Sequence, residues 1–111
     1  MATTYKVLGQ SAPADANNAD LYTVPSSTQT VVSTISATND TTSSATFRIF
    51  IRVAGAAAGA VNTLYYDAPL EANSTLMITS GLTLGAGDII TVRSSTANAL
   101  TFQAFGSEVT A

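Results

Sequence analysis

The side chains that could perform catalysis are few in this sequence of 111 residues. There is no histidine and no cysteine, which removes the most common general base near neutral pH and the thiol nucleophile. A serine–lysine pair would have to use Lys6, around which there is no motif. Asp67 and Glu71 flank Pro69, and paired carboxylates can hydrolyse glycosides, but two solvated loop charges are the simpler interpretation. We predict that the chain is not an enzyme and has no catalytic residues.

Metal and cofactor motifs are also missing from the sequence. Asp15, Asp20 and Asp40 are isolated in loop-like segments, without the regular spacing of acidic residues in a calcium-binding loop. The glycine-rich segment 81–87 follows a predicted strand and precedes another strand, whereas phosphate-binding loops lead into a helix. We therefore expect no metal and no cofactor.

The charge content restricts the kinds of partner. Only 10% of the residues are charged and the net charge is −3, against about 25% charged residues in typical domains. A chain without a basic field is poorly suited to neutralising phosphates, so we expect no nucleic-acid partner. The sequence shows no signal peptide at residues 1–6 and no apolar run near the roughly 20 residues of a membrane helix, so we expect no membrane association.

The sequence pattern predicts an all-β fold. Threonine and valine are abundant, and both favour strands because their β-branched side chains fit a pleated surface. Residues 46–53 alternate strictly, with Phe47, Ile49, Ile51 and Val53 on one side. In the strand at 29–38, the same parity places Val31, Ser33, Ile35 and Ala37 inward. The predicted strands cover residues 5–10, 21–24, 29–38, 46–53, 62–66, 75–80, 88–95 and 99–105.

The spacing of these strands predicts one antiparallel β-sandwich of about seven or eight strands over residues 1–111. Jelly-roll and immunoglobulin-like connectivity both fit this pattern. The segment 54–60 consists of alanine and glycine, and its two glycines favour a loop of small residues over a helix.

The predicted outward faces carry short uncharged hydroxyl side chains in place of lysine and glutamate. Free sandwich domains usually protect their strand edges with charges, so these faces are suited to being covered by neighbouring subunits. The aromatic residues Phe50 and Phe105 fall on the polar side of their strands, the first of them between Arg48 and Arg52. Aromatic and arginine side chains are enriched at protein interfaces. One interpretation is that Phe50 and Phe105 pack in the core, across a bulge or under a loop. The other is a subunit contact, and on that basis we predict an interface that uses Arg48, Phe50, Arg52, Phe105, Tyr65 and Tyr66.

Several blocks of the chain resemble small virion structural proteins of tailed bacteriophages, including those that infect cyanobacteria. The blocks are TTYKVLGQSAP, LYTVPSSTQTVVSTISATN, ATFRIFIRVAG, LYYDAPLEANSTLMITSGLTLGAGDIITV and FQAFGSEVTA. The similarity extends over almost the whole chain. One departure is the segment before LYYDAP, residues 56–62, which is short and apolar.

The resemblance implies a non-enzymatic particle component that is assembled in the host cytoplasm and located in the virion. Capsid decoration, or cement, is the first expectation, because such proteins are often compact sandwiches that form trimers or join adjacent capsid subunits. The expected partners are therefore further copies of the chain, as a homotrimer or other homo-oligomer, and the major capsid protein or other virion proteins.

Two alternative functions remain open from the sequence. The first is a structural part of the tail, neck or fibre. The second is a carbohydrate-binding module for adhesion to the host, which would need exposed aromatic rings. Since the chain has no tryptophan, the candidate rings are Tyr22, Tyr65 and Tyr66.

Overall fold

The computed structural model describes residues 2–79 and 81–110, which contain nine β-strands and two short 3₁₀ turns, Val53–Gly55 (η1) and Ala60–Asn62 (η2). No helix in this part of the chain is long and apolar enough to cross a membrane. The strands are β1 (Ala2–Ser11), β2 (Ala19–Thr23), β3 (Thr28–Asn39), β4 (Ala45–Arg52), β5 (Thr63–Leu70), β6 (Ser74–Ile78), β7 (Leu82–Leu84), β8 (Ile89–Ser94) and β9 (Leu100–Thr110).

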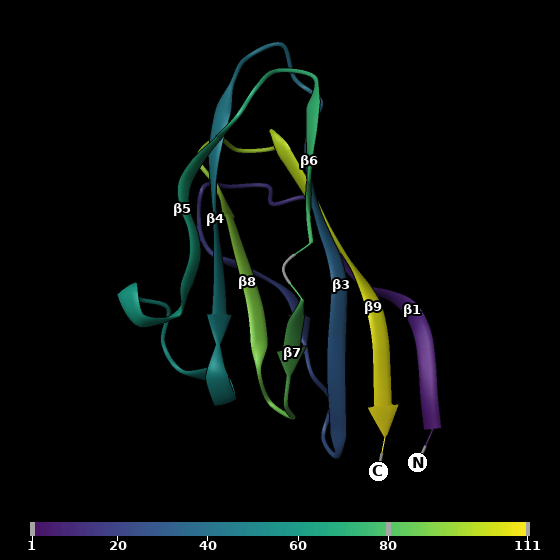
Figure 1. Ribbon diagram of the computed structural model, residues 1–111. Coiled ribbons are helices and arrows are strands. Elements are labelled where there is room, and N and C mark those ends of the chain that lie inside the picture. The colour runs from purple at the N-terminus through teal and green to yellow at the C-terminus, as the bar shows by residue number, and fades with distance from the viewer. Residues whose placement is uncertain (1, 80, 111) are drawn as a thin grey trace.

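The strands form two antiparallel sheets that face each other (Figure 1). The five-stranded sheet has the order β1-β9-β3-β6, and β7 pairs with β3 beyond the end of β6. The four-stranded sheet has the order β2-β8-β4-β5. The predicted β-sandwich is confirmed. The additional strand is β7, in a segment for which no strand was predicted, and Ser80 of the predicted strand 75–80 lies outside the described residues.

The strand order identifies the connectivity. The chain crosses between the sheets after β1, β2 and β3, stays in the four-stranded sheet for β5, and crosses again before β6, β8 and β9. The first strand consequently lies beside the last one, and β2 lies beside β8. This wrapping of paired strands around a barrel-like core is jelly-roll connectivity. The immunoglobulin-like alternative is therefore wrong.

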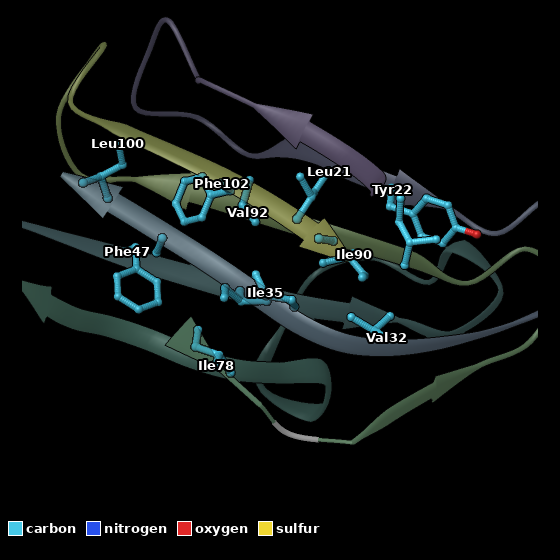
Figure 2. Packing of buried hydrophobic residues seen from close by; sticks show 14 of the residues in the cluster. Leu21, Tyr22, Val32, Ile35, Phe47, Ile78, Ile90, Val92, Leu100 and Phe102 are labelled. Carbon is cyan, nitrogen blue, oxygen red and sulfur yellow. The ribbon is translucent and has the colours of Figure 1, made fainter. Parts of the chain in front are cut away.

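The core lies between the two sheets and is built from the inward side chains of both (Figure 2). The Phe47 ring is fully buried in this core, with its centroid 6.1 Å from that of Phe102 and 5.6 Å from that of Tyr65. Phe47 and Ile49 are buried as the alternation predicts, but Val53 is exposed because the chain leaves the strand at Arg52 and turns into η1.

The predicted parity of β3 is correct only in its second half. Ile35 and Ala37 are buried as predicted, whereas Val31 is 46% exposed and Val32 only 1%. The register between β3 and β9 shifts between Val32 and Thr34, so Ser33 is an extra residue that reverses the alternation. The predictions that Val31 and Ser33 point inward are wrong, because a β-bulge separates them from Ile35.

Candidate interaction surfaces

A second bulge, in β5, gathers a set of side chains on the outer face of the four-stranded sheet. Tyr65 pairs with Ile49 and Ala68 with Phe47, so Tyr66 and Asp67 together oppose the single residue Arg48. Asp67 has a positive φ of 52°, a conformation that aspartate tolerates better than most residues. Both Tyr66 and Asp67 consequently contact Arg48, while Tyr65 points inward.

Arg48 is held by two neighbours from β5. Its Nε donates to Asp67 Oδ1 at 2.7 Å and its Nη2 donates to Asp67 Oδ2 at 3.2 Å. The guanidinium carbon lies 3.9 Å from the centroid of the Tyr66 ring, which is cation–π geometry. The hydrogen bonds from Arg48 lower the pKa of Asp67 below its usual value, and the pKa of Arg48 is raised by the same contact. Asp67 is therefore a strand residue in an ion pair, and not the free loop charge that its sequence position predicts.

A further arginine stands next to this pair. Arg93 of β8 is directly opposite Arg48 in the sheet, an arrangement of like charges that is unfavourable without compensation. Arg93 adds to the lowering of the Asp67 pKa, but within the described residues it has no hydrogen bond or ion pair of its own. Two guanidinium groups against one carboxylate leave one positive charge uncompensated.

These residues surround a hollow of about 620 Å³ on the sheet surface. Phe50, which is only 5% exposed, forms its base. Arg48, Arg93 and Tyr66 contribute walls from three neighbouring strands, and residues 58–60 close another side. Phe50 is therefore not part of the core between the sheets; it is buried on the opposite side of its strand, beneath this hollow.

The segment 53–62, here called the Ala–Gly loop, is the wall of the hollow outside the sheet. Arg52 fixes the start of this loop, because its Nε donates to the Ala56 carbonyl at 2.7 Å and its Nη2 to the Gly55 carbonyl at 3.1 Å. Arg52 also contacts Asp20 Oδ1 at 3.3 Å. The Asn62 side chain fixes the other end by bonding the Gly59 amide and the Ala57 carbonyl. Arg52 thus uses its donors to position the loop.

The outer face of the five-stranded sheet has a different character. Cross-strand pairing and alternation give the set of side chains that point outward from this sheet, which we call the neutral face. Its members are Thr3, Tyr5, Val7, Gln10, Gln29, Val31, Thr34, Ser36, Thr38, Thr75, Met77, Thr83, Thr101, Gln103, Phe105, Ser107 and Val109. None of these residues is charged. The two charged residues of the sheet strands in the described part of the chain, Lys6 and Glu108, point inward and form an ion pair of 3.4 Å.

Apolar side chains gather in the middle of the neutral face. Tyr5 and Val31 both pair with Ser107, and Val7 pairs with Phe105 two residues along β9. Tyr5, Val7 and Val31 are exposed and Phe105 is half-buried. These four residues, here called the apolar stripe, lie on β1, β9 and β3, with Ser107 of β9 between Tyr5 and Val31.

The predicted interface residues are thus distributed over three places. Arg48, Phe50 and Tyr66 meet at the hollow, with Arg52 beside the Ala–Gly loop. Phe105 lies on the opposite outer face, and Tyr65 packs against Phe47. Of the three rings considered for sugar stacking, Tyr22 is buried and Tyr65 is half-buried against the core, while Tyr66 is 60% exposed.

Arg93 is the charged residue of the hollow that sequence reasoning missed, and the neutral lining residues Asn18 and Thr63 were not chosen either. In the predicted strand 88–95, Ile90 and Val92 point inward, so the alternation directs Arg93, the next residue, outward. Its pairing with Arg48, however, joins strands that are far apart in the sequence. Within residues 2–79 and 81–110, no group of three acidic side chains is close enough to share a metal ion.

Comparison with known proteins gives a likeness of fold. No protein-family model and no curated protein matches the chain. A solved structure does. It is a chain from the structure of infectious bursal disease virus, Gx strain, with a TM-score of 0.52 and 9% sequence identity. The match covers 96% of this chain but 31% of the viral chain, so the fold described here corresponds to about a third of that protein.

Proposed function

We propose that the chain is a non-enzymatic structural component of a virus particle and that it binds its neighbours through the neutral face. The observation that carries the proposal is an outer sheet face whose described residues include no charge, and which carries the apolar stripe. The likeness to a chain of a virus structure supports it, and so does the jelly-roll connectivity, which is common in capsid proteins.

The physical basis is the low cost of covering such a face. Burying a charged side chain without a partner is expensive, whereas short hydroxyl side chains lose little rotamer entropy and need only a hydrogen-bond partner. The apolar stripe adds favourable burial of about 25 cal/mol per Å² of apolar surface. Tyr5 and Phe105 supply aromatic anchors of the type that is enriched at interfaces.

Within this role we favour a decoration protein on the capsid of a tailed bacteriophage, which forms homotrimers and contacts the major capsid protein. The resemblance of the sequence blocks to virion proteins of tailed phages supports this assignment. A component of the tail, neck or fibre is the second candidate, since the same neutral face would serve there as well.

Copy number distinguishes the two locations. Purified particles are digested, and the chain is quantified by mass spectrometry relative to the major capsid protein and to a tail protein. A decoration protein gives a number of copies comparable with that of the major capsid protein, and mild treatment that removes it leaves intact but fragile heads. Copies comparable with a tail protein would assign it to the tail, and absence from purified particles would contradict the structural role.

A matched pair of substitutions tests the neutral face itself. Val31→Glu introduces a charge in the apolar stripe, whereas Val61→Glu introduces the same charge at a 96% exposed position of the Ala–Gly loop. Both sites are exposed, so we expect each variant to keep its unfolding free energy within about 0.5 kcal/mol of the parent chain. Only Val31→Glu should lose self-association in light scattering and attachment to particles. Equal association of the two variants would show that the neutral face is not the interface.

A further inference from the structure

The hollow on the four-stranded sheet has features of a ligand site that the structural role does not use. Its charge is the first of these features. The chain as a whole has a net charge of −3, yet Arg48 and Arg93 lie side by side here with Asp67 as the nearest compensating group. Arg48 directs one edge of its guanidinium, formed by Nε and Nη2, to Asp67, and Arg52 donates to two carbonyl groups of the Ala–Gly loop. Arg93 is left with free donors at the wall of the hollow, as far as the described residues show.

This arrangement selects the charge of the ligand. A free guanidinium is a planar fork that binds a carboxylate through two parallel hydrogen bonds. The carboxylate of Asp67 is close enough to affect the site electrostatically, and it would repel a second negative charge. A ligand with one carboxylate therefore fits better than a doubly charged phosphate.

The shape of the hollow selects the body of the ligand. Its volume of about 620 Å³ is within the range of small-molecule sites, which are mainly apolar with a few polar groups that fix orientation. Phe50 at the base and Tyr66 at the wall offer apolar ring surfaces. Asn18 and Thr63 at the lining provide neutral polar groups suited to hydroxyls. The Ala–Gly loop bounds one side, which favours a compact ligand over an extended peptide.

We propose that this hollow binds an acidic sugar residue, with Arg93 holding the carboxylate and with Phe50 and Tyr66 contacting the sugar ring. The small side chains of the Ala–Gly loop leave the space that the ring occupies. A Cβ added at Gly59 meets no atom within 4 Å, which shows how open this wall is. The activity would be adhesion to an acidic polysaccharide, and it is independent of the contact made by the neutral face on the opposite side of the sandwich.

The test is an NMR chemical-shift titration of the full chain, with glucuronate as the probe and glucose as its neutral counterpart. Glucuronate should give saturable shifts confined to Phe50, Tyr66, Arg93 and the Ala–Gly loop, and glucose at the same concentration should give much weaker ones. Arg93→Gln should weaken glucuronate binding roughly tenfold or more, because a charge-assisted bidentate contact is lost. Lys6→Gln removes the same charge elsewhere and should leave binding unchanged.

A second variant tests the shape independently of charge. Gly59→Leu fills the hollow from its open wall, where the glycine has an extended backbone with φ −171° that other residues can adopt. Gly59→Leu should abolish the binding of glucuronate, although Arg93 is still present and the thermal unfolding midpoint is that of the parent chain.

Three results would overturn the proposal. They are no binding of glucuronate by the parent chain, equal loss in Arg93→Gln and Lys6→Gln, and binding of a glutamate-rich peptide in place of the sugar, which would make the hollow a protein-docking site. Attachment of Arg93→Gln to particles is measured in parallel. It should remain intact, so a failure of sugar binding is separable from a failure of the structural role.

Discussion

The outer face of the four-stranded sheet carries charged side chains on three of its strands and on the bulge of a fourth, whereas the neutral face carries none in the described residues. The charged residues of the first face are Asp20, Arg48, Arg52, Asp67 and Arg93. On the five-stranded sheet, Lys6 and Glu108 are turned inward and pair with each other. The two outer faces of the sandwich therefore differ in charge: one exposes charged side chains, and the other exposes uncharged ones among the described residues.

The difference separates two kinds of binding. Covering the charged face with another protein would require partners for several ions, and solvated ion pairs contribute little to compensate for that loss. Covering the neutral face removes hydroxyls and apolar atoms from water at much lower cost. This difference supports the proposals of subunit contact at the neutral face and of a small charged ligand at the hollow.

Both faces depend on β-bulges. In β5 the bulge at Asp67 brings Tyr66 and Asp67 to the same arginine. In the five-stranded sheet, β3 inserts Ser33 between its partners for Gly106 and Phe105 of β9, and β1 inserts Leu8 between its partners for Phe105 and Ala104. These paired bulges keep the uncharged side chains outward along the full length of the neutral face.

The largest effect is expected at Gly106 of β9, which lies against the backbone of β3. A Cβ built there would lie 2.0 Å from the Val31 carbonyl oxygen and 3.1 Å from the Val32 Cα, both backbone atoms. Since backbone atoms cannot rotate away, Gly106→Ala should destabilise the chain by about 3 kcal/mol, at the upper end of the usual cost of overpacking. Urea unfolding measures this loss, and self-association should weaken with it because the bulge underlies the neutral face.

The matched control is Gly59→Ala on the other face. Because its Cβ would meet open space, we expect an unfolding free energy within about 0.5 kcal/mol of the parent chain. Similar destabilisation by both alanines would mean that β9 and β3 are not in the close contact described above.

The sequence predicts those features of the fold that depend on local properties, namely the alternation of side chains and the residue composition. Alternation in β4 located its inward residues, and the threonine-rich strands indicated a sandwich. The choice of jelly roll depends on β1 lying beside β9 and β2 beside β8, pairings that no local pattern encodes. The error at Val31 has the same origin. The bulge at Ser33 is defined by the pairing of β3 with β9, and the alternation within β3 alone does not predict it.

The candidate sites divide along the same line. Arg48 and Phe50 could be chosen because their outward direction follows from the alternation of a single strand. Tyr66 was chosen as an aromatic, but its contact with Arg48 depends on the bulge at Asp67. Arg93 was missed because its importance comes from a neighbour on another strand.

A smaller effect is expected where the inward charges of the five-stranded sheet meet the other sheet. The Tyr22 hydroxyl donates to the Glu108 carboxylate and is 2.8 Å from Thr30 Oγ1, and Figure 2 shows the Tyr22 ring beside Ile90 at the edge of the core. Tyr22→Phe leaves these groups without that partner and should cost about 1–2 kcal/mol in urea unfolding. An unchanged stability would indicate that water replaces the hydroxyl without loss.

The pH dependence of the same contact has a definite sign. Burial, followed by the hydrogen bond to Glu108, raises the pKa of Tyr22 from 10.0 to about 12. A raised pKa means that the fold favours the protonated hydroxyl, so its contribution is complete below pH 10 and is lost as the pH rises toward 12. Tyrosinate absorbance during alkaline titration should therefore show one late-titrating tyrosine, which is absent from Tyr22→Phe.

The smallest effect is expected on the charged face, at the ion pair between Asp67 and Arg48. The hydrogen bonds from Arg48 lower the pKa of Asp67 below its ordinary value of 3.8, so the fold favours the carboxylate. The resulting stabilisation is present above pH 3.8 and is lost as the pH falls through the lowered pKa. Because both side chains contact solvent, the change in unfolding free energy should be slight, and a carbon-detected NMR titration of the Asp67 carboxyl is the suitable measurement. In Arg48→Gln this pKa should return toward the ordinary value, though not fully, since Arg93 remains nearby. If Arg48→Gln left the pKa of Asp67 unchanged, Arg93 would be the effective partner of Asp67, and the free donors assigned to Arg93 would not exist.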